Sequence, residues 1–162
     1  MKISGICILL FLGNFSANSQ AVQKNKIKIG AGISLALPVY NLDISTTGGG
    51  VDVLLQYGLS RSVNLTGDVG FTGLPGKGVY PSTAIIPIRL GLRYFPVPKI
   101  YIAGKAGLGH YTILKASASY TAYAAGAGYM ISKKFDASCY YDGFTNNNSS
   151  FGYIAIRAGY QF

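Results

Sequence analysis

Three residues in the sequence have the chemistry of a hydrolase site, although they lie far apart along the chain. His110 could act as the base, Ser119 as the nucleophile and Asp142 as the residue that orients the histidine. In hydrolases these three roles come from separate elements of the fold. A histidine near the end of a strand, with serines close by, is more often a solvated loop cluster. We therefore predict no catalytic residues and no enzyme activity.

Other kinds of chemical site find less support in the residue types. The chain has one histidine and two cysteines, which are too few for a convincing metal site. The glycine-rich run 104–109 around Lys105 lacks the strand-to-helix setting of a phosphate loop. The net charge is +9, but the basic residues are scattered and do not form one stripe. We predict no cofactor, no metal and no nucleic-acid partner.

The spacing of apolar residues indicates which elements must position the remaining charged side chains. In residues 151–162 apolar residues occupy every second position from Ile154 to Phe162, while Arg157 falls on the other face. A period of two is typical of a strand with one apolar face. Similar patterns predict eight strands, at about 26–37, 49–59, 62–72, 84–95, 100–110, 119–131, 134–144 and 151–162. We expect an all-β fold, an eight-stranded antiparallel up-and-down transmembrane β-barrel.

The charged residues of these strands share the face opposite the Ile, Leu and Val residues. If that face lines the lumen, no strand exposes a charge to lipid, where Arg or Lys at the midplane would cost ~2–4 kcal/mol. Eight strands enclose an interior that side chains can fill. We predict an ion-paired lumen network with room provided by inward glycines. Its members are Lys28, Asp52, Asp68, Arg89, Arg93, Lys105, Asp136 and Arg157.

The N-terminal residues predict export. A basic start, an apolar run from Ile6 to Leu12 and the small residues Ala17 and Ser19 are typical of a cleaved signal peptide. We predict a signal peptide at 1–19 and one barrel domain at 20–162. Cys139 is then the only cysteine of the mature chain, which leaves no intramolecular disulfide.

The predicted links between strands alternate in length. Short links fall near 60–61, 96–99 and 132–133, and longer ones cover 38–48, 73–83, 111–118 and 145–150. Prolines 96 and 98 are expected to turn the chain, since neither can donate to a ladder. Outer-membrane barrels have short periplasmic turns and longer outside loops. A tyrosine then stands near the periplasmic end of every second strand: Tyr57, Tyr94, Tyr129 and Tyr160. Such a belt suits the membrane interface.

Several short motifs, in order, carry a resemblance to a known family. They are Gly-Leu-Arg-Tyr-Phe at 91–95, the run 100–109, Gly-Ala-Gly-Tyr at 126–129 and the terminal Tyr-Gln-Phe. Together they resemble the small eight-stranded outer-membrane barrels of the OmpX type and the membrane domain of outer membrane protein A, also described as porin-family barrels. The resemblance implies a bacterial outer-membrane location and a monomer surrounded by outer-membrane lipid. It also implies that the barrel-assembly machinery recognises Tyr160 and Phe162.

We predict a structural or surface-interaction role without catalysis, for an extracellular partner that the sequence does not identify. One alternative is a narrow nonspecific pore for small solutes or ions. A less favoured one is a lipid-modifying hydrolase, because barrels of similar size include such enzymes. A soluble barrel that carries an apolar ligand fits poorly, because its polarity would be the inverse of the pattern seen in this chain.

Overall fold

The chain forms eight strands in the computed structural model, which describes residues 24–114, 116–147 and 149–162. The strands are β1 (Ile27–Tyr40), β2 (Gly48–Gly58), β3 (Val63–Leu74), β4 (Thr83–Val97), β5 (Ile100–Ile113), β6 (Ala116–Met130), β7 (Phe135–Thr145) and β8 (Ser150–Gln161). The predicted signal peptide lies outside the described residues. No helix in the described part of the chain has the length and apolarity to cross a membrane.

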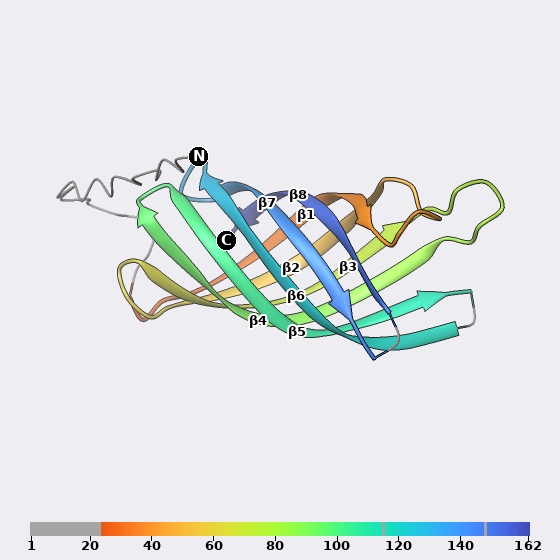
Figure 1. Ribbon diagram of the computed structural model, residues 1–162. Coiled ribbons are helices and arrows are strands. Elements are labelled where there is room, and N and C mark those ends of the chain that lie inside the picture. Colours follow the sequence, from red (N-terminus) through yellow and green to blue (C-terminus); the bar gives the residue numbers. More distant parts are fainter. Residues whose placement is uncertain (1–23, 115, 148) are drawn as a thin grey trace, which may run out of the picture.

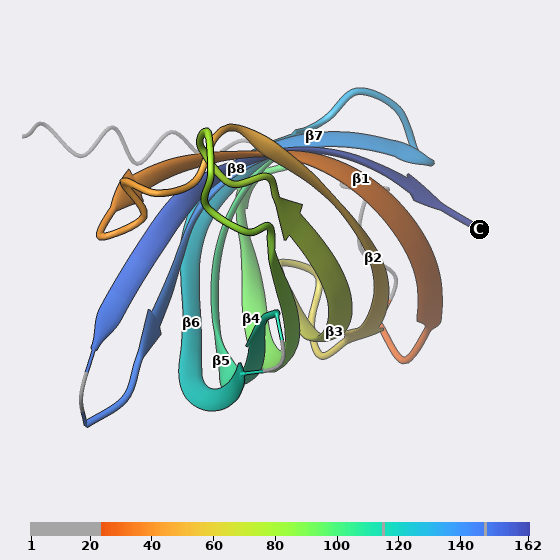
Figure 2. The same cartoon turned by 90° about the vertical axis from the view of Figure 1, so that its right-hand side faces the viewer.

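Each strand pairs antiparallel with the next, and β8 pairs with β1 to close the barrel. At this closing seam Ile33 lies opposite Ala158 and Ser34 opposite Arg157. Figure 1 shows the barrel from the side, and Figure 2 shows the strands arranged around a common axis. The predicted eight-stranded antiparallel fold is confirmed.

The two faces of the wall have opposite character. On β4, Ile88 and Leu90 are exposed outward, whereas Arg89 between them is buried inside. The same alternation follows from the period of two in the other strands, because successive side chains point to opposite faces. Within the described strands, every Asp, Lys and Arg lies on the inner face.

The two ends of the barrel differ in their links. Residues 59–62, 98–99 and 131–134 connect strands at the end where β1 begins and β8 ends. At the far end, loops 41–47 and 75–82 are tied together, because Thr46 N donates to Pro75 O (2.7 Å) and Lys77 N donates to Ile44 O (2.7 Å). Leu42 and Leu74 are buried beneath them.

One of the long links predicted from the sequence is wrong. In place of a loop at 111–118, β5 and β6 continue as a hairpin in which Tyr111 pairs with Ala118 and Ile113 with Ala116. The predicted loop at 145–150 is reduced to 146–149, where Asn146 N donates to Ser149 O. Backbone pairing extends through small polar residues whose composition resembles a loop.

The predicted proline turn at 96–99 is also shorter than expected. Pro96 lies within β4, where the pairing with β5 shifts register between Tyr94 and Val97. A proline is tolerated at such an irregularity because no ladder bond from its nitrogen is needed there. Only Pro98 and Lys99 form the link.

Candidate functional site

The lumen contains two groups of ion pairs. In the first, the Arg157 guanidinium forms a bidentate ion pair with Asp52. Its Nε donates to Oδ1 (2.8 Å) and its Nη2 donates to Oδ2 (2.7 Å). Its Nη1 also lies 3.4 Å from Asp136 Oδ2. The same Asp136 oxygen accepts a hydrogen bond from Tyr101 Oη at 2.5 Å. One arginine thereby connects β8 to β2 and β7.

The second group is centred on Arg89 of β4. Its guanidinium donates to Asp68 Oδ2 through Nη2 (2.7 Å) and Nε (3.1 Å), and its Nη1 forms an ion pair with Asp142. Lys105 Nζ lies 3.2 Å from the other oxygen of Asp68. Strands β3, β4, β5 and β7 are thus joined by ion pairs. Those of Arg89 are charge-assisted hydrogen bonds, which are stronger than neutral ones.

The remaining predicted members lie nearer the end that carries the chain termini. Arg93 is buried, with its guanidinium carbon 3.9 Å from the centroid of the Tyr101 ring and its Nη1 3.3 Å from Gln56 Oε1. Such stacking of a cation on an aromatic ring is favourable when both are removed from water. Lys28 is on the inner face and only half-buried.

Asp142 is a member of the network that the sequence reasoning missed. The sequence suggests Asp142 only as a possible hydrolase residue, whereas the structure buries its side chain in the lumen against Arg89. Its position six residues after Asp136 in the same strand was the available signal, because an even separation puts both on one face. His110 and Ser119 lie opposite each other on β5 and β6, on the outer face of the wall, whereas Asp142 lies on the inner face, so the three residues do not come together.

An aromatic cluster closes the lumen toward the far end. Phe144 stacks on Phe151 (centroids 5.0 Å apart) and on Tyr153 (5.8 Å). Tyr111 and Tyr120 pack against Phe151 at 5.2 and 5.0 Å. We call these five residues the aromatic plug. The sequence reasoning did not single them out.

Little space remains between the aromatic plug and the ion pairs. A cavity of about 30 Å³ lies among Asp68, Arg89, Asp142, Tyr153 and Arg157. That volume accommodates about one water molecule. The lumen is therefore a packed core.

Glycines on the inner face make room for the long side chains. A Cβ atom on Gly32 would overlap the guanidinium group of Arg157, and one on Gly159 would overlap Arg157 and Asp136. Gly104, in contrast, faces outward, and its added Cβ would meet nothing within 4 Å.

This contrast yields a matched pair of substitutions. Gly32→Val is expected to destabilise the barrel by about 1–3 kcal/mol, because the new side chain displaces the Arg157 fork. Gly104→Val, the same change on the lipid-facing side, should be nearly neutral. Urea unfolding in lipid vesicles measures both, and equal stability of the two variants would contradict this account of the inner glycines.

The predicted tyrosine belt and assembly signal lie together on the outer wall. Tyr57, Tyr94 and Tyr129 are exposed and Tyr160 is partly exposed, all near the end that carries the chain termini. Phe162 contacts Tyr160 edge to face, with centroids 5.1 Å apart. Recognition of these two residues by an assembly machinery stays a prediction.

Solved structures with the same fold include membrane barrels of bacteria. Ail, the attachment invasion locus protein of Yersinia pestis, has a TM-score of 0.65 and 16% identity, covering 86% of this chain and 100% of that one. Neisserial surface protein A has a TM-score of 0.59 and 14% identity, covering 83% and 95%. The N-terminal barrel of Pseudomonas aeruginosa OprF has a TM-score of 0.56 and 17% identity, covering 86% and 98%. At these identities the likeness concerns the fold.

No curated protein matches the chain. The model of a protein family described as "outer membrane protein beta-barrel domain" matches residues 7–162. This match covers nearly the whole sequence and confirms the resemblance drawn from the short motifs. The chain therefore belongs to the outer membrane protein beta-barrel domain family.

Proposed function

We propose that this protein is a closed, non-conducting barrel with a structural role in the outer membrane. Its far end serves as a surface for interaction with another molecule. The observation that carries the proposal is the filling of the lumen by the ion pairs and the aromatic plug, where the cavity lined by Asp68, Arg89, Asp142, Tyr153 and Arg157 measures about 30 Å³. A hydrated ion needs a continuous water-filled path, and this interior offers room for about one water. The narrow pore is therefore the weaker alternative.

The far end carries side chains suited to contact with another protein. Val79 is 98% exposed, Leu114 79% and Tyr80 54%. Val79 and Tyr80 are neighbours in the 75–82 link, whereas Leu114 lies in the turn between β5 and β6. Asp43 and Lys77 are the charged residues of the described links at this end, so the charges of the described links balance. Ail was also solved with the heparin analogue sucrose octasulfate. For the far end of the present chain, a partner protein with an apolar surface is a better candidate than a sulfated ligand.

Planar-bilayer recording tests the closed lumen. We expect no discrete conductance steps from the purified full barrel, because the Arg89 and Arg157 ion pairs and the aromatic plug fill its interior. Steady single-channel openings that are absent from protein-free membranes would contradict the closed barrel and support the narrow pore instead.

Labelling of intact cells tests whether the far end is presented outside. In a Cys139→Ser background, Val79→Cys should react with a membrane-impermeant maleimide on intact cells. Arg61→Cys, in the link at the opposite end, should react only after the cells are broken. Labelling of Arg61→Cys alone on intact cells would show the reverse orientation and rule out a surface role for the 75–82 loop.

A further inference from the structure

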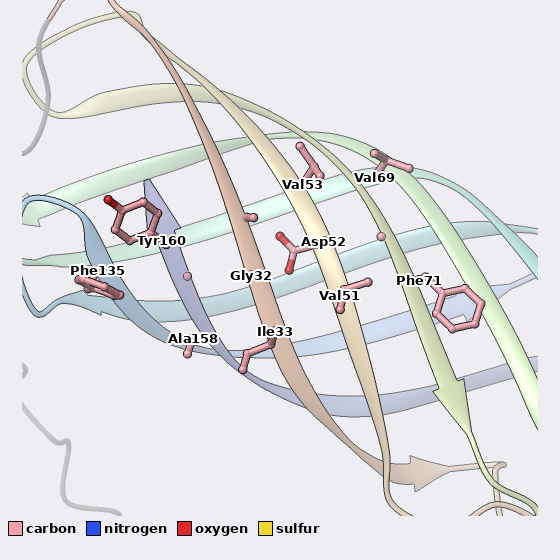
Figure 3. Close-up of a pocket in the computed structure, with 13 residues that line it drawn as sticks. Gly32, Ile33, Val51, Asp52, Val53, Val69, Phe71, Phe135, Ala158 and Tyr160 are labelled. Carbon is pink, nitrogen blue, oxygen red and sulfur yellow. The ribbon is translucent and has the colours of Figure 1, made fainter. Parts of the chain in front are cut away.

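The outer wall contains an apolar groove that the proposed function does not use. It has a volume of about 610 Å³, and Ala31 and Ala158 supply small outward side chains along it. Figure 3 shows Phe135 and Tyr160 at one end of the groove and Phe71 at the other. We call this depression, which crosses β7, β8, β1, β2 and β3, the lipid-side groove.

The lipid-side groove runs obliquely to the barrel axis, because its residues follow the pairing of successive tilted strands, as in Tyr160–Ala31–Val53–Val69. Phe135 opens β7 and Tyr160 lies near the end of β8, both at the end where the chain termini lie. Phe71 lies near the far end of β3. An acyl chain whose headgroup lies at the interfacial end of the groove can follow this oblique path toward the middle of the hydrocarbon layer.

A cation stands at the interfacial end of the groove. Lys134 Nζ lies 3.3 Å from Tyr160 Oη and 5.6 Å from the centroid of the Tyr160 ring. Phe135 and Phe162 flank that ring edge to face, at 4.9 and 5.1 Å. The long lysine side chain follows the aromatic surface and carries its charge to the level of lipid headgroups.

The rim around Lys134 has one sign of charge. The described residues 24–26, 59–62, 98–99 and 131–134 contain no Asp or Glu. Their charged residues are Lys24, Lys26, Arg61, Lys99, Lys133 and Lys134. Two copies of the barrel meeting through this groove would bring like charges together, whereas an anionic headgroup is complementary to the rim.

We propose that the lipid-side groove holds one acyl chain of an anionic phospholipid, with the lipid phosphate bound by Lys134. Since bulk lipid is as apolar as the groove, the shape of the groove holds the chain in place and Lys134 supplies the preference for a negative headgroup. One lysine near a charged membrane surface contributes about 1 kcal/mol, which corresponds to about fivefold in binding. The proposal does not depend on whether the lumen conducts.

Native mass spectrometry of the full barrel tests this proposal. The protein is released from micelles that contain equal amounts of phosphatidylglycerol and phosphatidylcholine. We expect one retained lipid, with phosphatidylglycerol favoured about fivefold. Lys134→Gln should remove the preference, and Ala158→Phe, which fills the groove, should remove the retained lipid.

Two control variants separate the site from general effects. Lys99→Gln removes a cation of the same rim that lies beside Tyr129, 6.0 Å from its ring centroid, away from the groove. Ala106→Phe enlarges an outward residue elsewhere on the wall. Both should retain the lipid with unchanged preference, and the gel shift between unheated and boiled samples should show that all variants fold. Equal retention of both lipids by the wild type, unchanged retention by Ala158→Phe, or a lipid-free dimer would overturn the proposal.

Discussion

Replacing Arg89 with methionine is expected to lower the free energy of unfolding by about 3–5 kcal/mol, the range for removing one partner of a buried ion pair. Arg89 lies between Asp68 and Asp142, and all three side chains are buried in the lumen. Methionine fills much of the same volume but leaves Asp142 without its cation. The cost arises mainly from that unpaired buried carboxylate.

The matched control for this change is Arg61→Met, which removes an arginine from an exposed turn. That variant should stay within about 0.5 kcal/mol of wild type. Adding Asp142→Asn to Arg89→Met should recover part of the loss, because the second change removes the unpaired charge. The fraction folded at each urea concentration, read from the shift between unheated and boiled samples on a gel, measures all three. Equal effects of Arg89→Met and Arg61→Met would show that the lumen network does not stabilise the barrel.

The sequence was enough to predict which side chains of a strand face lipid and which face the lumen, because one local rule decides this. A charge on the outer face would meet hydrocarbon, so the phase of the alternation is fixed wherever a strand carries an Asp, Lys or Arg. This rule places Arg157 inside and Ile156 outside without knowledge of any partner strand. It also applies to Asp142 and Tyr153, which the sequence reasoning could have assigned to the lumen by their spacing from Asp136 and Arg157.

The pairing within the lumen could not be predicted in the same way. Arg157 binds Asp52, although 105 positions separate them in the sequence. Which acid each base meets depends on how the strands are staggered around the closed barrel, and that stagger is a property of all eight strands. The hairpin at 111–118 was missed for a related reason. Its Ser and Ala residues resemble a loop, while the pairing that extends it is made by the backbone.

Deleting Phe162 is expected to separate assembly from stability. The Phe162 ring is 74% exposed, and its backbone nitrogen donates one hydrogen bond to Ile29 O at 2.9 Å. A side chain so exposed contributes little to the folded barrel, so refolding of the purified variant into detergent should remain close to wild type. If an assembly machinery reads the terminal aromatic residue, the same variant should largely fail to reach the outer membrane in cells.

Phe135→Ala is the matched control, because Phe135 also packs on the Tyr160 ring, at 4.9 Å, but lies at the start of β7. It should insert in cells as the wild type does. The amount of heat-modifiable barrel in isolated outer membranes, compared with the yield of refolding in detergent, measures both steps. Normal insertion of the Phe162 deletion would refute the targeting role. A deletion that failed equally in detergent would instead show that Phe162 acts through closure of the β1–β8 seam, where its nitrogen meets Ile29.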